Sequence, residues 1–402
     1  MADPGPPARR QALFVSALLV ACTVLGLAGT DLVLPAVPEL PAVLGGSAAR
    51  AQLVLATFTA GTALGLLLFG ELGVRFTARS LLLGAMLAYA VTSVAGARAD
   101  SLGALIAIRF LQGVAASCAA VVAPGVVRAL FDERGALRAL GALGSVESLA
   151  PAIAPVIGVW LLQFGGWSTS FWVTAALAAL LAAAVAIAGR RIPGVAVRRS
   201  RLGYWYLLQN RAFQRYALSQ GLALASLLVF VFAMPAVFVT ALGGTVRDFI
   251  VMQLLGISSF IVAANLSGTL VDRFSAEVVI VRGSLLALVG ALLMLVYGLI
   301  GGREAPVIWL LFLPLNMGFG FRGPPSFLLA LQVAGGDDTR ASALIIMYVM
   351  LFTAAATALL APFVSTGLWP AALAATVLGA ISIAILFLLP LAGLAPRRRS
   401  MD

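Results

Sequence analysis

The sequence has neither lysine nor histidine, and charged residues make up only 10% of its 402 positions. A nucleotide-binding loop of the form G-x-x-x-x-G-K-[ST] is excluded, because that loop needs a lysine. Only two cysteines occur, both inside apolar runs, so the sequence offers no metal-ligand cluster. The absence of histidine and of a nucleophile–base pair also argues against an enzyme. We therefore expect no catalytic activity, no cofactor and no metal.

What the sequence does contain is apolar residues, which make up 62% of the chain. An average soluble domain is about 45–50% apolar, and a soluble fold could not hide this much apolar surface. About 20 apolar residues cross a bilayer as a helix. The sequence therefore predicts an all-α polytopic membrane protein with twelve transmembrane helices, at residues 11–34, 51–72, 79–97, 101–125, 137–163, 168–189, 214–242, 248–271, 277–300, 306–331, 341–365 and 369–394.

All 26 basic residues are arginines, and the formal net charge is +11. With the N-terminus placed in the cytoplasm, 20 arginines fall in inner loops and tails and four in outer loops. Such a bias orients spans in the bilayer and does not indicate nucleic acid as a partner. The polar N-terminal tail has no small-residue cleavage site, so we expect the first span to be retained. The pattern predicts a multi-pass membrane protein with both termini cytoplasmic.

The longest connection, residues 190–213, divides the twelve spans six and six. This predicts an N-terminal six-helix bundle over 1–189, a basic cytoplasmic linker, and a C-terminal six-helix bundle over 214–402. Two six-helix halves suggest a duplicated transporter architecture. Within the linker we expect a surface helix on the anionic leaflet.

An internal repeat supports the duplication. "GELGVRFTAR" (70–79) and "GTLVDRFSAE" (268–277) share G-x-L-x-x-R-F at equivalent places in the two halves. The repeat resembles the loop signature of the major facilitator superfamily, roughly G-x-L-x-D-R-x-G-R-R, although Val74 replaces the acid of the first copy. The resemblance implies the major facilitator fold, with two pseudo-symmetric bundles, and a conformational latch formed by Gly70, Arg75, Arg79, Gly268, Asp272 and Arg273.

Three further stretches resemble the bacterial drug:proton antiporters of the Bcr/CflA type. They are "TDLVLPAVP" (30–38), "RFLQG" (109–113), and "APVIGVWL" (154–161) followed by "GWSTSF" (166–171). This resemblance implies a proton-coupled antiporter that exports drugs or other small amphipathic molecules by alternating access. Its partners would be the small-molecule substrate, protons and the lipid bilayer, and we expect a monomer.

Asp31 lies near the outer end of the first span, where an unpaired carboxylate in hydrocarbon is costly. Pro35 and Pro38 cannot continue a regular helix, so they should end or bend the span just beyond this acid. Asp31 is the leading proton-site candidate, unless it simply reaches the headgroups. Arg109, at matching depth, is its expected partner and shares a helix face with Gln112. The alternative for this pair is a purely structural salt bridge.

Glu147 and Arg322 are the other charges expected deep inside spans. Glu147 is a second proton-coupling candidate, or a neutral carboxyl held by a hydrogen bond. The glycines and prolines around Arg322 predict a broken helix, which membranes tolerate where it is buried or lines a wet cavity. We expect Glu147 and Arg322 to face one substrate cavity from opposite halves. Arg322 could instead have a structural partner, or lie close enough to the inner surface to snorkel. The other substrate-binding candidates are Gln112, Phe58, Phe230 and Met234.

Two alternatives to drug export remain open. The intramembrane arginines could bind an organic anion or metabolite in the same fold. A non-transporting membrane sensor would be a different class, but buried charges in both halves argue against an inert scaffold.

Overall fold

The computed structural model describes residues 9–73, 75–193, 203–335 and 338–389. Several side chains within these ranges, mainly between 133 and 152, are also outside the description. The described residues contain helices and no strand. In the N-terminal half the elements are α1 (Arg9–Asp31), η1 (Leu34–Glu39), α2 (Leu40–Leu44), α3 (Ala48–Leu72), α4 (Ala78–Ala97), α5 (Leu102–Ala116), α6 (Cys118–Leu130), α7 (Glu133–Gly165), α8 (Thr169–Ala188) and η2 (Gly189–Arg191).

The helix α9 (Gly203–Gln209) precedes the C-terminal half. That half contains α10 (Arg211–Ala236), η3 (Val237–Ala241), α11 (Val246–Phe274), α12 (Ala276–Leu299), α13 (Ala305–Gln332), α14 (Asp338–Leu360), η4 (Ala361–Phe363) and α15 (Trp369–Leu388). Among the described residues, eleven helical stretches are long and apolar enough to cross a membrane. The 33-residue α7, which includes the apolar stretch Ile153–Gly165, brings the number to the predicted twelve.

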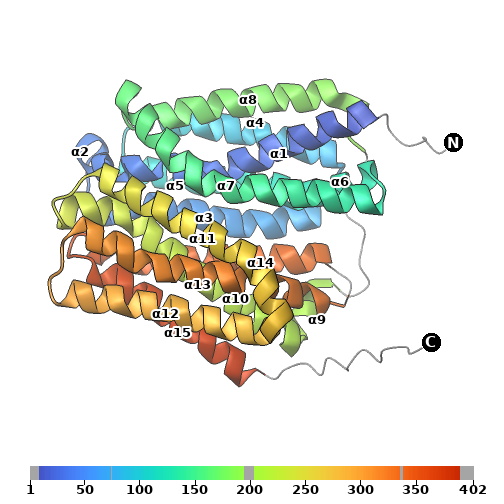
Figure 1. Cartoon of the computed structure of the whole chain (residues 1–402). Coiled ribbons are helices and arrows are strands. Elements are labelled where there is room, and N and C mark those ends of the chain that lie inside the picture. The colour runs from blue at the N-terminus through green and yellow to red at the C-terminus, as the bar shows by residue number, and fades with distance from the viewer. Residues whose placement is uncertain (1–8, 74, 194–202, 336–337, 390–402) are drawn as a thin grey trace, which may run out of the picture.

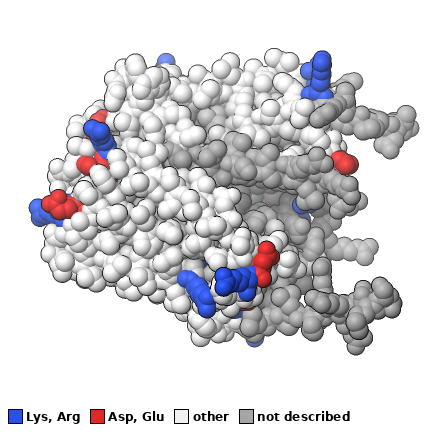
Figure 2. Space-filling model, viewed as in Figure 1, with Lys and Arg blue, Asp and Glu red and all other residues white. Residues whose placement is uncertain are grey.

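The two halves lie side by side, with α1–α8 above α10–α15 in Figure 1. We call the end that carries α2 the α2 end, and the opposite end the α9 end. The start of α1 and the finish of α15 both point toward the α9 end, as an even number of spans requires. Charged side chains gather toward the two ends in Figure 2, and the surface between them is largely uncharged. This belt has the character of a lipid-facing surface.

Glycines let neighbouring helices approach closely. A methyl group at Gly61 of α3 would collide with the carbonyl oxygen of Phe110 in α5. A methyl group at Gly113 of α5 would likewise collide with the carbonyl oxygen of Phe58 in α3. Small residues at such crossings are typical of membrane helices, where tight van der Waals packing drives association.

The predicted break around Arg322 is wrong, because α13 runs without interruption from Ala305 to Gln332. Pro314, Pro324 and Pro325 all lie inside this helix. The glycines serve packing: a methyl group at Gly320 would collide with the Phe260 carbonyl oxygen in α11. Neighbouring membrane helices can support a proline-containing helix in this way.

The halves share one hydrophobic cluster at the α2 end. Completely buried Leu34 of η1 and Leu55 of α3 belong to the same cluster as Phe230 and Phe238 of the C-terminal half. Toward the α9 end, the described core residues form separate clusters, one mainly in α1–α8 and one in α9–α15. The α2 end is therefore closed by contacts between the halves.

The expected helix in the linker is present as α9. Its Leu207 is completely buried in the core of the C-terminal half, whereas Trp205 is 70% exposed. The short helix is therefore anchored on one side and open to its surroundings on the other. The bundle boundaries at 189 and 214 stay predictions.

Candidate functional site

The site around Asp31 is built by the end of α1. The α-helix stops at Asp31, and residues Leu34–Glu39 form a 3₁₀-helix that contains Pro35 and Pro38. The prediction that prolines end the span just beyond the acid is thus confirmed. Asp31 is 9% exposed, so its carboxyl group lies inside the protein and does not reach freely into the surroundings.

Arg109 of α5 is completely buried and ties three helices together. Its Nη1 donates to the Gly29 carbonyl oxygen (3.0 Å) and to Gln112 Oε1 (2.7 Å). Its Nε donates to the Val54 carbonyl oxygen (3.3 Å). The guanidinium also stands over the Phe58 ring, 4.1 Å from the ring centre. Arg109 is fixed by backbone carbonyls of α1 and α3 as well as by its own helix.

A relay of polar groups extends from Arg109 into α4. Gln112 Nε2 donates to Ser93 Oγ (2.7 Å), and Ser93 Oγ donates to the Tyr89 carbonyl oxygen (2.7 Å). The prediction that Gln112 shares a helix face with Arg109 is confirmed by their hydrogen bond. Because every member is buried, the relay holds the guanidinium in one orientation.

Asp31 and Arg109 are near enough to interact electrostatically, but no ion pair or hydrogen bond joins them. The Nη2 atom of Arg109 is buried and has no hydrogen-bond partner among the described residues. The structure therefore brings the predicted pair together without the salt bridge of a purely structural contact. One donor group of the guanidinium therefore remains for an acceptor outside the described residues.

Glu147 lies in α7, but its side chain is outside the described residues. Its predicted proton-coupling and substrate-binding roles stay predictions. Eleven residues after Glu147, α7 packs closely against the end of α1: a methyl group at Gly158 would collide with the carbonyl oxygen of Leu32, the residue after Asp31. The backbone that follows Asp31 is thus packed against the helix that carries Glu147.

Arg322 of α13 is completely buried within the C-terminal half. Its Nη1 donates to Ser382 Oγ of α15 (2.7 Å) and its Nη2 to Ser219 Oγ of α10 (2.9 Å). Each serine hydroxyl also contacts the backbone carbonyl of the other, at 2.9 and 2.7 Å. A side chain with no exposed surface lines no open cavity in this conformation. Its role in substrate binding, and its expected cavity shared with Glu147, stay predictions.

The predicted cavity residues are packed in this conformation. Phe58 lies under the Arg109 guanidinium, and Phe230 stacks on Phe312 with 5.5 Å between ring centres. Met234 is completely buried in the cluster at the α2 end. Closure of this end buries Phe230 and Met234, whereas Phe58 is buried among residues of its own half. Contact of the three side chains with a substrate stays a prediction.

The predicted latch residues lie at the α9 end. Arg79 donates to the Ala186 carbonyl oxygen of α8 (3.3 Å), within its own half. Arg75, Asp272 and Arg273 are exposed, and Asp272 forms no ion pair with any described residue. A methyl group at Gly70 would contact the Tyr204 hydroxyl of α9 (2.7 Å), whereas Gly268 has open space around it. The latch itself stays a prediction.

Sequence reasoning missed Ser219, Ser382 and Gln52. The serines hold Arg322, and Gln52 Nε2 donates to the Phe232 carbonyl oxygen of the other half (2.9 Å). Their only signal is a polar residue within an apolar run. Membrane helices carry many such residues, most of which bond within their own helix, as Thr57 does to the Leu53 carbonyl oxygen.

Comparisons with known proteins agree with this architecture. A family model described as Major Facilitator Superfamily matches residues 19–358. An uncharacterized MFS-type transporter of Bacillus subtilis, YdgK, is 27% identical over 86% of this chain and 88% of its own length. A chloramphenicol resistance protein of Pseudomonas aeruginosa is 30% identical over 66% of this chain, and the match spans 64% of that relative.

A solved structure with a similar fold is a bacterial homologue of the human lysosomal transporter Spinster, in an inward-facing and unoccupied conformation. It aligns with a TM-score of 0.76 over 95% of this chain and 97% of its own, at 13% identity. The resemblance found in the sequence motifs is confirmed.

Proposed function

The chain belongs to the major facilitator superfamily, and on that premise we propose that it is a proton-coupled antiporter. It exports drugs or other small amphipathic molecules from the bacterial cytoplasm by alternating access. The arginine bias supports an inner-membrane orientation in which the α9 end, with both termini, faces the cytoplasm. The drug class is supported by the similarity of the chain to a protein named for chloramphenicol resistance.

The observation that carries the proposal is the pair of Asp31 and Arg109, both buried and close but without an ion pair. A buried carboxyl group next to a fixed cation is sensitive to small movements. It holds its charge when the cation approaches or water enters, and takes up a proton when both withdraw. Arg109 is held by Gly29, two residues before Asp31, so movement of α1 against α5 changes this balance.

The closed α2 end supports a direction for the proposed cycle. In this conformation, the contacts between η1 and α10 separate Asp31 from the outer side. Opening the α2 end exposes Asp31 to the outer medium, where it takes up a proton. Closing it again and admitting substrate from the α9 end displaces that proton into the cytoplasm. Glu147, on the helix packed against the end of α1, is the second candidate for this exchange.

The test is transport by purified protein in liposomes, with labelled chloramphenicol as the probe and a pH gradient as the driving force. Asp31→Asn should abolish gradient-driven transport while exchange of labelled for unlabelled chloramphenicol continues. The matched control is Asp248→Asn, at a partly exposed carboxyl that accepts a hydrogen bond from Thr245 at the same end. Full gradient-driven transport by Asp31→Asn would make Glu147 the candidate proton site instead.

A second readout is proton release into weakly buffered detergent solution. Chloramphenicol should release protons from the parent protein and not from Asp31→Asn. A protein that transports a compound without releasing protons would be a uniporter, and one that neither transports nor releases protons would be a non-transporting sensor.

The alternative substrate class, an organic anion or metabolite, is favoured by Arg322. Its guanidinium is completely buried, and no described carboxylate pairs with it. Such a cation attracts an anionic ligand if the surrounding helices open. Uptake of labelled organic anions that Arg322→Gln abolishes, with chloramphenicol exchange absent in the parent, would identify this class.

A further inference from the structure

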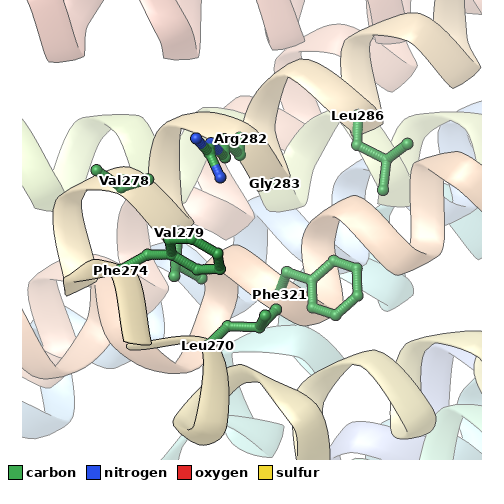
Figure 3. Close-up of a pocket in the computed structure, with 8 residues that line it drawn as sticks. All are labelled: Leu270, Phe274, Val278, Val279, Arg282, Gly283, Leu286 and Phe321. Carbon is green, nitrogen blue, oxygen red and sulfur yellow. The ribbon is translucent and has the colours of Figure 1, made fainter. Parts of the chain in front are cut away.

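A groove lies on the outside of the C-terminal half, where α11, α12 and α13 meet near the α9 end. Its volume is about 190 Å³. Leu270 and Phe274 of α11, Leu286 of α12 and Phe321 of α13 surround it, and Arg282 stands on one side (Figure 3). The groove therefore has apolar walls and one positively charged side chain.

Arg282 lies on the exposed surface of α12, six residues after the helix begins at Ala276. At 1.5 Å per residue, it lies about 9 Å along the helix from Ala276. Its guanidinium stands over the Phe274 ring, 5.0 Å from the ring centre. Arg273 stands over the same ring at 5.4 Å. Two cations thus flank Phe274 at the charged end of the groove.

Neither arginine has an anionic partner within the described part of the chain. In the described part of the chain the ion pair joins Arg215 to Glu277. The arginine Nη1 and Nη2 atoms donate to the two carboxylate oxygens, at 3.0 and 3.1 Å. Tyr216 also donates to Glu277, so this carboxylate is already bound on the inner side of α12. Asp272, two residues from both Leu270 and Phe274, lies on another face of α11. The groove therefore keeps a net positive charge.

An exposed arginine beside apolar side chains near the end of a span is costly next to hydrocarbon unless its guanidinium reaches the headgroup region or an anion. The surroundings of a lipid-facing groove supply such an anion as the phosphate of a phospholipid. Apolar walls of the groove fit an acyl chain, and basic pockets between helices on the cytoplasmic side suit anionic headgroups. We infer that this groove binds one anionic phospholipid, with the phosphate between Arg273 and Arg282 and one acyl chain against Phe321 and Leu286.

The inference does not depend on which substrate is transported. The lipid phosphate would give Arg273 a binding partner outside the predicted latch. The lipid would brace the corner between α11 and α12, where Ser275 has a left-handed backbone with φ of 100°. A lipid at this corner would connect two helices that the chain joins by a single non-helical residue.

The test is native mass spectrometry of the full-length protein in detergent with equal amounts of phosphatidylglycerol and phosphatidylcholine. The parent protein should retain phosphatidylglycerol preferentially. Arg282→Gln and Arg273→Gln should each reduce that preference by about fivefold, as expected for one arginine near a charged headgroup. Arg128→Gln is the matched control, because Arg128 is exposed near the same end but outside the groove.

A second pair of variants tests the acyl-chain part of the groove. Leu286→Trp should fill the groove and reduce retention of the lipid. Leu285→Trp, at an exposed neighbour that does not line the groove, should leave retention unchanged. Equal retention of the two lipids by the parent protein, or an unchanged preference in the double arginine variant, would overturn the inference. So would displacement of the lipid by excess inorganic phosphate, which would show a simple anion site.

Discussion

Gln52 of α3 and the backbone of Phe232 in α10 are joined across the two halves by a hydrogen bond of 2.9 Å. Gln52 is completely buried, and its Oε1 atom has no partner in the described structure. This polar contact lies beside the hydrophobic cluster that closes the α2 end. It is directional, so unlike the apolar contacts around it, it requires one relative position of α3 and α10.

Replacing Gln52 with leucine should favour opening of the α2 end. The net contribution of a hydrogen bond to stability is about 0.5–1.5 kcal/mol. The ratio of open to closed protein should therefore rise about two- to tenfold. Distances between spin labels at Val43 and Arg247, one in each half, measure this ratio. Thr240→Val is the control, because its hydroxyl bonds within one half to the Ala236 carbonyl oxygen. An equal shift in both variants would mean that the bond across the halves has no special effect.

Arg109→Lys should keep the charge but lose most of the hydrogen bonds to Gly29, Val54 and Gln112. A lysine ammonium cannot reproduce the planar fork of the guanidinium. Each buried acceptor left without a donor costs about 1–3 kcal/mol, so thermal unfolding should move to lower temperature and transport should fall. Arg98→Lys, at an exposed guanidinium over Trp172, should change neither. Unimpaired transport by Arg109→Lys would leave positive charge as the only requirement.

Ser219→Ala and Ser382→Ala should each destabilise the C-terminal half by about 1.5–3 kcal/mol, the usual range for a hydrogen bond to a charged group. Arg322→Met should recover stability in the double-alanine background, because it removes the buried cation that the serines satisfied. Thermal unfolding measures each variant. Ser226→Ala is the control, since Ser226 bonds the Ala375 carbonyl oxygen between the same two helices without contacting an arginine. Failure of Arg322→Met to recover stability would assign the loss to the contact between helices.

Gly61→Ala should destabilise the protein, because the added methyl group meets the Phe110 carbonyl oxygen of α5. Forcing extra atoms into a packed interior typically costs about 1–3 kcal/mol. Gly84→Ala is the matched control, since nothing lies within 4 Å of its added methyl group. That change should be neutral or stabilising by up to about 1 kcal/mol, as expected for alanine in a helix. Thermal unfolding of both variants decides whether close approach, and not helix propensity, requires Gly61.

Reporter tags should place the N-terminus, residue 194 and the C-terminus in the cytoplasm, and Gly302 in the periplasm. The expected orientation follows from the arginine bias of 20 to four. Paired reporters active only in the cytoplasm or only in the periplasm provide the measurement. A periplasmic signal at residue 194 would contradict the division into six and six spans.

The sequence was sufficient where a local rule decides the structure. Apolar length predicted the spans, and Pro35 and Pro38 predicted the end of α1 at Asp31. The sequence was insufficient where contacts with helices distant in the sequence determine the local structure. The same proline rule failed at Pro324 and Pro325, because α13 packs closely against its neighbours and remains helical.

The candidate site shows the same difference between features set by local sequence and features set by distant helices. Arg109 and Gln112 are three residues apart on one helix, so their bond could be predicted. The partners of Arg322 are 103 residues before it, in α10, and 60 residues after it, in α15, so no local pattern points to them. Whether Phe230 and Met234 are buried or line a cavity depends on which end of the molecule is closed. A sequence alone does not specify that end.

The cluster at the α2 end implies that the halves can recognise each other without a covalent connection. Leu34 and Leu55 meet Phe230 and Phe238 there, and α9 is already anchored to the C-terminal half through Leu207. Two separately synthesised fragments, divided between residues 193 and 203, should therefore assemble in the bilayer into a complete molecule. The linker then determines how often the two halves encounter each other, whereas the cluster determines how they pack.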